Sequence, residues 1–206
     1  MPRRSSFHFQ ARMITASPLE QMLGIRSSQA VNLDTEVKVD WIETPVGPLL
    51  AGATRSAVVL LEFSERDILQ QQLAAIRERF KTSIQPGRNV WLDALHVQLE
   101  EYFAARRRQF DLPLEYPGTP FQQRVWSTLL TIPYGATWSY LDMARSLGDP
   151  KATRAVGTAN GMNRIAIVIP CHRVINANGK LGGYGGGLWR KQILLDLERG
   201  QRPLGI

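Results

Sequence analysis

The chain has 206 residues, of which 44% are hydrophobic and 21% charged, a composition typical of a globular protein rather than a disordered one. No apolar run approaches the roughly 18 residues that a membrane span requires, and no secretory signal is recognisable at the N-terminus. One cysteine excludes an intramolecular disulfide and a cysteine-rich zinc site and fits a reducing compartment, so we expect a cytoplasmic protein without a metal.

The net charge of +7 is unevenly distributed along the chain. Residues 119–206 contain eleven Lys and Arg against four Asp and Glu, whereas residues 1–118 contain fourteen of each. A basic half beside a neutral half favours a polyanionic partner such as nucleic acid. A solvated basic surface is the alternative.

Two segments are expected before the basic half. Residues 1–35 are predicted to be a tail and linker, with a short helix and the start of a second one between residues 7 and 26. Residues 36–115 show strand and helix periodicities that predict a small α+β domain without visible chemistry. Its strands are expected at 37–42, 49–53 and 57–63, and its helices at 65–80, capped by Ser64, and 89–105, capped by Asn89.

A proline-rich boundary at residues 112–118 precedes a mainly helical domain at 119–206. Cap residues and apolar spacing predict helices at 119–130, 139–147, 151–161 and 188–199. The turn Gly148-Asp149-Pro150 joins the middle two as a helix-turn-helix. Small residues dominate the second helix of this pair, at 151–161, and Arg154 is the long side chain in its middle. This favours groove contact without sequence specificity, with Arg154 inserted where a base has left the stack.

The most informative stretch runs from Ile165 to Ile175. Its first five residues are apolar and four are β-branched, which predicts a buried strand ended by Pro170. Cys171 and His172 follow, and a thiol beside a proton acceptor can be a nucleophile. A lone cysteine that merely packs is the alternative. Because adjacent residues of an extended chain face opposite ways, a water or third group would relay the proton, and Glu198 is the best acidic candidate.

The segment Pro170-Cys171-His172-Arg173-Val174 and its flanks resemble the O6-alkylguanine-DNA alkyltransferases, the methylated-DNA–protein-cysteine methyltransferases, over about residues 37–200. The resemblance implies a ribonuclease H-like N-terminal α/β domain, and a helical C-terminal domain with a winged-helix-like helix-turn-helix and the active cysteine. The first residues resemble the remnant of an AraC-type helix-turn-helix, as upstream of this domain in bacterial Ada-type proteins.

The resemblance also implies roles for single residues. Cys171 would accept the alkyl group, His172 would activate it through a bridging water, Glu198 would orient His172, and Asn163 would join the DNA-binding unit to the active segment. Tyr140, Tyr184 and Lys191 would form the substrate pocket, and Arg154, Tyr140 and Arg173 would contact DNA.

The implied function is direct repair of O6-alkylguanine, with O4-alkylthymine as a further substrate, by a single irreversible transfer to Cys171. Double-stranded DNA would be the partner, and the protein would act as a monomer without a cofactor. The alternatives are a non-enzymatic lesion-binding protein, an Ada-like regulator fragment, a multiple-turnover cysteine hydrolase and a transcription factor.

Overall fold

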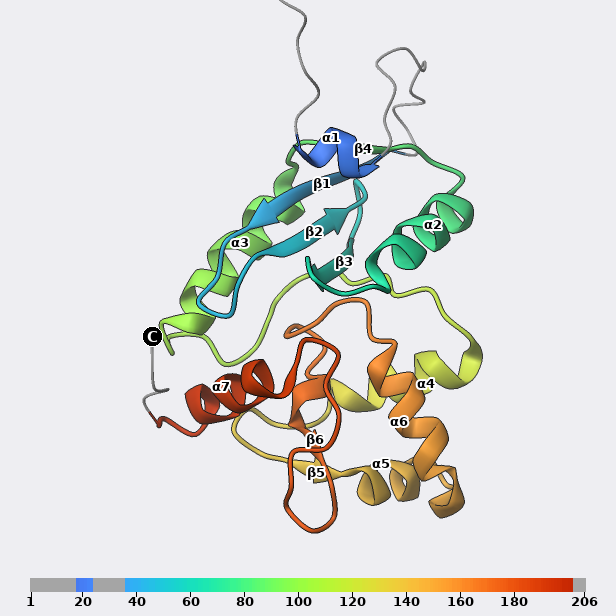
Figure 1. Ribbon diagram of the computed structural model, residues 1–206, viewed down its shortest axis with the longest axis vertical. Coiled ribbons are helices and arrows are strands. Elements are labelled where there is room, and N and C mark those ends of the chain that lie inside the picture. Colours follow the sequence, from blue (N-terminus) through green and yellow to red (C-terminus); the bar gives the residue numbers. More distant parts are fainter. Residues whose placement is uncertain (1–17, 24–35, 202–206) are drawn as a thin grey trace, which may run out of the picture.

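A computed structural model describes residues 18–23 and 36–201, in which a sheet-containing N-terminal half lies above a helical C-terminal half (Figure 1). The elements of the first half are α1 (Pro18–Leu23), β1 (Val37–Ile42), β2 (Leu49–Ala53), β3 (Val58–Phe63), α2 (Leu69–Phe80), β4 (Ile84–Pro86) and α3 (Val90–Phe103). Those of the second half are α4 (Pro120–Leu129), β5 (Trp138–Ser139), α5 (Tyr140–Ser146), η2 (Pro150–Ala152), α6 (Thr153–Gly161), η3 (Cys171–Arg173), β6 (Val174–Ile175) and α7 (Leu188–Glu198). The predicted α+β class is confirmed.

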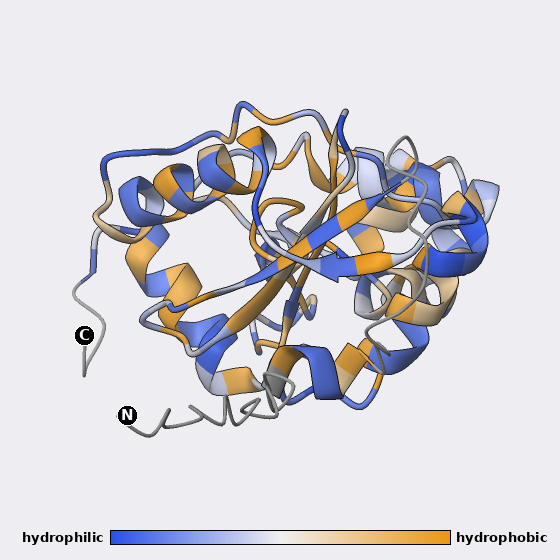
Figure 2. Ribbon diagram, turned by 90° about the horizontal axis from the view of Figure 1, so that it is seen from above, coloured by the Kyte–Doolittle hydropathy of each residue, from blue (hydrophilic) through white to orange (hydrophobic). Residues whose placement is uncertain are grey.

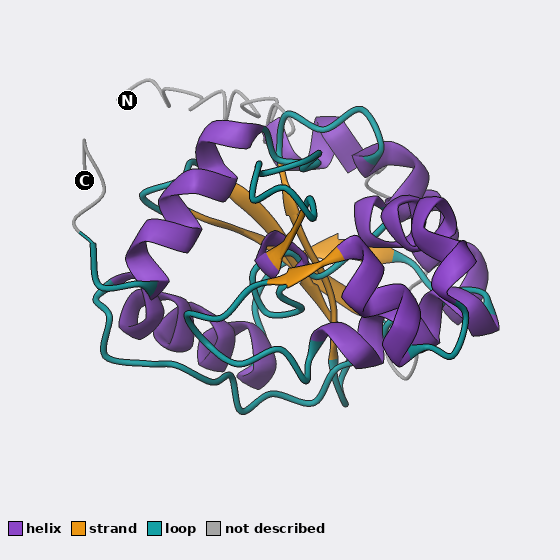
Figure 3. Cartoon of the chain, turned by 90° about the horizontal axis from the view of Figure 1, so that it is seen from below, coloured by secondary structure: helices purple, strands orange, loops and turns teal. Residues whose placement is uncertain are grey.

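The main sheet is covered on both faces. Its strand order is β3-β2-β1-β4, with β4 parallel to β1 and the other pairs antiparallel. Leu49 and Ala51 pack with α3 and the C-terminal half, whereas Leu50 and Leu60 pack with α2 on the other face. This burial explains why β2 is apolar throughout and why β3 is apolar except at Glu62. These apolar stretches appear orange in Figure 2, and Figure 3 shows the strands among the surrounding helices.

The free edge of β3 is occupied by two segments of the same chain. The amide of Val58 donates to the Pro113 carbonyl at 2.9 Å, within the boundary between the halves. Further along the strand, the Leu61 amide donates to the Arg164 carbonyl, and the Leu61 carbonyl accepts from the Ala166 amide, each at 2.8 Å. The sheet therefore positions the segment that leads into Cys171.

One apolar cluster joins the two halves. It contains Leu95 and Leu99 of α3 together with Val125 and Trp126 of α4 and Leu194 of α7, all buried. The predicted boundary at 112–118 therefore separates segments that share a core, and the division into two domains stays a prediction.

The predicted strand at 165–169 is wrong. The segment is a tight turn, in which the Ile169 amide donates to the Ile165 carbonyl at 2.9 Å. Ile167 has a φ of 70°, which is strained for a β-branched residue. Only Ile165 makes a β-bridge, to Leu61. Apolar composition correctly indicated burial here but could not distinguish a buried turn from a strand.

The other predicted elements agree closely with the structure, apart from helix ends and very short strands. The helix predicted from residue 65 begins at Leu69, because turns occupy the preceding residues and Ser64 caps nothing. Strands β4, β5 and β6 have two or three residues each and were not predicted. The predicted helix-turn-helix is confirmed as α5, η2 and α6, and Ser139 and Asp142 form its capping box.

Most of the predicted N-terminal tail, including most of the stretch compared with an AraC-type remnant, lies outside the described residues. Helix α1 is the part that is described, and Leu19 and Leu23 pack on the sheet face that α2 covers. None of the described helices has both the length and the apolar character needed to cross a bilayer.

The shared core predicts that the two halves unfold together. We expect one thermal transition, in which the calorimetric and van't Hoff enthalpies agree, because the cluster of α3, α4 and α7 cannot be opened from one side alone. Differential scanning calorimetry of the full chain tests this. Two resolved transitions would show that each half has an independent core.

Candidate active site

Cys171 borders a cavity of about 170 Å³ that both halves of the chain enclose. The cavity is smaller than the roughly 300–1,000 Å³ of typical small-molecule pockets, so whatever enters must fit closely. Residues 182–187 form a glycine-rich loop at one side of the cavity. The walls are Glu62, Phe63 and Arg66 from the N-terminal half, Tyr140, Gly157, Asn160, Gly161, Asn163, Ala166 and Cys171, and Gly183, Tyr184, Gly185 and Gly186 of this loop.

The sulfur of Cys171 is held by Asn163. Cys171 is only 6% exposed and begins η3, directly after Pro170. The Nδ2 of Asn163 donates to Sγ at 3.1 Å and to the Ile169 carbonyl at 2.8 Å, while its Oδ1 accepts from the Ile165 amide at 3.0 Å. One amide side chain therefore fixes both the turn and the thiol, and its role in joining this segment to the DNA-binding unit stays a prediction.

The thiol is not ionised by its surroundings alone. Burial raises the pKa of Cys171, and the hydrogen bond from Asn163 and the charges of Lys191 and Arg66 offset this only in part. The resting protein therefore holds a thiol, and forming the nucleophilic thiolate requires a base.

His172 has the protonation state of such a base. It is fully buried, and its Nε2 lies 2.8 Å from Oε1 of Glu198. Burial lowers the pKa of His172 although Glu198 opposes this, so the ring is neutral and its proton lies on Nε2, facing the carboxylate. The other nitrogen, Nδ1, is buried without a protein partner among the described residues and retains its lone pair.

Glu198, on the last turn of α7, accepts hydrogen bonds from three other parts of the structure, namely η3, α3 and the turn at Gly135. Besides His172, the donors are Tyr102 of α3 at 2.8 Å, Arg173 at 2.9 and 3.0 Å, and the Gly135 amide at 3.1 Å. Burial raises the pKa of Glu198, but the hydrogen bonds from His172 and Arg173 and the charge of Arg173 outweigh this effect and hold the pKa well below its usual range. The carboxylate is therefore ionised and orients the imidazole.

Arg173 does not lie where its predicted contact with DNA requires. It is 7% exposed, and besides Glu198 its guanidinium donates to the Ile132 carbonyl at 2.6 Å. The desolvated carboxylate needs a cation, which explains why this arginine points inward. We correct its role to that of the counter-ion of Glu198.

Lys191 also differs from its predicted place in the substrate pocket. Its side chain is fully buried, and Nζ donates to the carbonyls of Val174 at 2.6 Å, Gly183 at 3.2 Å and Leu181. Burial lowers its pKa to about 8, although Cys171 opposes this. Lys191 does not line the cavity but holds the glycine-rich loop that does.

The two predicted tyrosines do border the cavity. The hydroxyl of Tyr140 donates to the Gly183 carbonyl at 3.4 Å, and burial and the nearby Cys171 raise its pKa. Tyr184 packs edge-on against Phe63, with ring centroids 6.1 Å apart. Its hydroxyl is buried without a partner among the described residues, and burial raises its pKa well above the usual value. An incoming polar group would satisfy this hydroxyl.

Helix α6 joins the surface to the cavity. Arg154 is exposed near its N-terminus, as the predicted DNA contact requires, while Asn160 and Gly161 at its other end line the cavity. Asn160 also donates to the Cys171 carbonyl at 3.3 Å. Exposed and cavity-lining residues therefore lie on one short rigid element.

Several residues at this site were not predicted, namely Glu62, Phe63, Arg66, Tyr102, Gly135 and Asn160. Most of them reach Cys171 or Glu198 only through tertiary contacts, so no local pattern marks them. Asn160 is an exception, because its position at the end of the predicted helix, three residues before Asn163, could have suggested it. Within residues 18–23 and 36–201, no three His, Cys, Asp or Glu side chains gather as metal ligands would.

Comparison with known proteins identifies the family. Residues 120–200 match the family model described as "6-O-methylguanine DNA methyltransferase, DNA binding domain". The methylated-DNA–protein-cysteine methyltransferase of Mycobacterium tuberculosis is 46% identical over 165 residues, which cover 80% of this chain and 94% of that protein. The chain belongs to the methylated-DNA–protein-cysteine methyltransferase family.

Further relatives extend the similarity to this family. The constitutive methylated-DNA–protein-cysteine methyltransferase of Bacillus subtilis is 42% identical over 158 residues, covering 76% of this chain and 92% of its own. The crystal structure of Mycobacterium tuberculosis OGT in complex with DNA has a TM-score of 0.70 at 43% identity, and covers 82% of this chain and 96% of that one. The similarity therefore includes both halves, and the predicted family is confirmed.

In this family member, the hydroxyl of Tyr102 links the N-terminal half to Glu198. Replacing Tyr102→Phe removes one donor from a buried carboxylate, so we expect the free energy of unfolding to fall by about 1.5–3 kcal/mol, the range for hydrogen bonds to charged groups. Urea denaturation measures this. Tyr116→Phe is the matched control, because its hydroxyl contacts Ser127 at the surface, and a similar loss there would contradict the assignment.

The Glu198 carboxylate should also make stability depend on pH. Glu198→Gln leaves Arg173 buried without its counter-ion, so we expect a loss of about 3–5 kcal/mol near neutral pH. Because the folded pKa lies below the unfolded value of about 4.3, the stabilisation is complete above that value and is lost as the pH falls below it.

The difference in the free energy of unfolding between the wild type and Glu198→Gln should therefore become smaller as the solution is acidified from about pH 7 to about pH 3. Urea denaturation at each pH provides the free energies of unfolding. Glu100→Gln, at an exposed carboxylate on α3, is the control and should show a small difference throughout. A difference for Glu198→Gln that stays constant on acidification would contradict the depressed pKa.

Proposed function

We propose that this protein repairs alkylated DNA by direct reversal, taking the alkyl group of O6-alkylguanine onto Sγ of Cys171. The observation that carries the proposal is that one small cavity contains Cys171 and is walled by the helix-turn-helix that presents Arg154. A duplex held on α6 would have its extruded base beside the sulfur, and chemistry on a base requires it to leave the stack.

The proton of Cys171 would leave through His172. A water bridging Sγ and Nδ1 would pass the thiol proton to the imidazole, whose Nε2–H remains on Glu198. The carboxylate stabilises the imidazolium that forms. Lys191 and Arg66 lower the pKa of Cys171, which favours the thiolate once the base has accepted its proton.

The transfer step is a displacement at the alkyl carbon. The thiolate donates an electron pair to that carbon, the bond between the carbon and O6 breaks, and its electrons remain on the guanine. The guanine then takes up one proton, for which the Tyr140 hydroxyl at the cavity wall is the proposed donor. The proton held by His172 would return to Tyr140 through water, so that neither group is left charged. The products are an unmodified guanine and a thioether, and because no group here cleaves a thioether, each molecule reacts once.

The other groups would position the DNA. Arg154, exposed on a helix of small residues, would fill the space of the extruded base. Tyr140 would also contact the backbone of the target nucleotide, and Tyr184 would line the base pocket. We also propose that the protein acts as a monomer in the cytoplasm, because one chain supplies every group named above and a single cysteine fits a reducing compartment.

The decisive test is the mass of the protein after incubation with a duplex oligonucleotide that contains O6-methylguanine. We expect one added methyl group, on the peptide that contains Cys171, and a titration that ends at one equivalent of DNA. Cys171→Ala should abolish the transfer but still bind the duplex. Continued transfer by this variant, or turnover beyond one equivalent, would refute the proposal.

A further inference from the structure

A second hollow adjoins the cavity of Cys171. It has a volume of about 470 Å³, opens to the surface, and is bordered by Glu65, Ile68 and Trp189. Both hollows share Arg66, Gly185 and Gly186 in their walls. These three residues therefore lie between the two hollows and form a partition.

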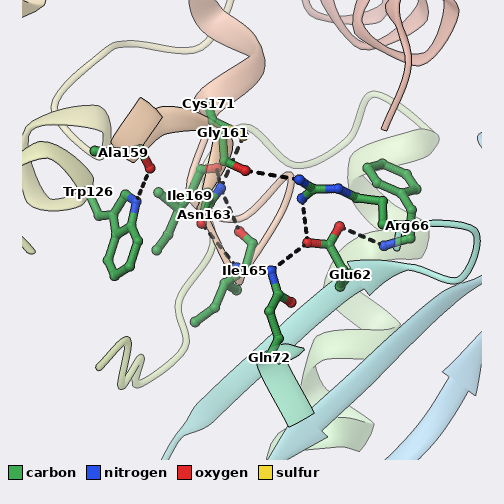
Figure 4. A network of polar contacts seen from close by, with 11 residues as sticks. Glu62, Arg66, Gln72, Trp126, Ala159, Gly161, Asn163, Ile165, Ile169 and Cys171 are labelled. Carbon is green, nitrogen blue, oxygen red and sulfur yellow. Dashed lines mark hydrogen bonds and ion pairs between the residues drawn. The ribbon is translucent and has the colours of Figure 1, made fainter. Parts of the chain in front are cut away.

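The side chain of Arg66 closes this partition. Its Nη1 pairs with Oε2 of Glu62 at 2.6 Å, and its Nη2 donates to the Gly161 carbonyl at 2.9 Å, so the guanidinium spans from β3 to the end of α6 (Figure 4). Gly185 lies directly against it, since a Cβ at that position would lie 2.3 Å from Cζ of Arg66. The loop approaches Arg66 as closely as a glycine allows.

The partner of Arg66 is itself fixed. Glu62 is fully buried and also accepts from Gln72 of α2 and from the Phe63 amide, each at 2.9 Å. Figure 4 shows the carboxylate between Gln72 and the guanidinium. Moving Arg66 aside would leave a buried carboxylate without its cation, which is costly. The partition is therefore built to stay closed.

We propose that Arg66 sets the upper size limit of the O6 substituent that this protein can accept, an inference that rests on the proposed alkyl transfer. A methyl group ends at the sulfur and fits within the cavity of about 170 Å³. A substituent the size of a benzyl group extends past the sulfur and needs the space beyond the partition. Arg66 thus acts as a specificity-determining residue, contributed by a half of the chain that carries none of the catalytic groups.

Competing substrates test the size limit. Rate constants for transfer are measured with duplexes that contain either O6-methylguanine or O6-benzylguanine. The wild type is compared with a double variant, Arg66→Ala with Glu62→Gln, in which the second substitution avoids an unpaired buried carboxylate. We expect the ratio of benzyl to methyl transfer to rise at least about tenfold in the double variant, the lower end of what a steric misfit in a pocket provides.

Two controls separate the effect of the partition from those of its neighbours. Glu62→Gln alone weakens the hold on the guanidinium but keeps its bulk in place, so it should raise the ratio less than the double variant does. Arg79→Ala removes one exposed arginine far along α2, where it approaches Glu115 at 4.0 Å, and should change neither rate. An unchanged ratio in the double variant, with both rates measurable, would overturn the size limit.

The same measurements distinguish the inference from the proposed function. If the wild type transfers no methyl group, the proposed function itself fails. If the double variant does not fold, Arg66→Lys replaces it, because an ammonium cannot hold Glu62 and Gly161 together as the guanidinium fork does. That variant should raise the ratio by a smaller factor, and an unchanged ratio would again overturn the inference.

Discussion

A single buried carboxylate organises this molecule. Glu198 is 5% exposed, and its charge is tolerated only because Tyr102, His172, Arg173 and the Gly135 amide all donate to it. Taking a carboxylate out of water costs several kcal/mol unless such partners are in place. The donors come from three separate stretches of the sequence, so meeting this requirement brings α3, α7, η3 and the turn before β5 to one point. The position of His172, and with it the proposed base, follows from that convergence.

The N-terminal half contributes to the site without supplying its chemistry. Tyr102 reaches Glu198, β3 pairs with the segment before Cys171, and Glu62 and Arg66 wall the cavity. Three sets of contacts thus relate the N-terminal half to the site. A change at the sheet can therefore alter which substrates reach Cys171 while the groups that would transfer the alkyl remain intact.

Local patterns in the sequence predicted local features well. The capping residues Thr119 and Ser139, the helix-turn-helix and the exposed position of Arg154 all depend on neighbours within a few residues. The inward direction of Arg173 and Lys191 could not be predicted, because each is set by acceptors that only the fold assembles. Of the ten basic residues of the C-terminal half that the structure describes, three are buried, namely these two and Arg190, so the charge count overstated the surface offered to DNA.

The occupied edge of β3 has a consequence for the behaviour of the protein in solution. A sheet with an open edge can recruit a strand from another molecule, which leads to aggregation. Here the main-chain groups of Val58 and Leu61 are already bonded within the chain. At the opposite edge, β4 has only three residues and ends in Pro86, which has no amide hydrogen to offer. The segment that delivers the reactive cysteine thus also helps to keep neighbouring molecules from associating through their sheets.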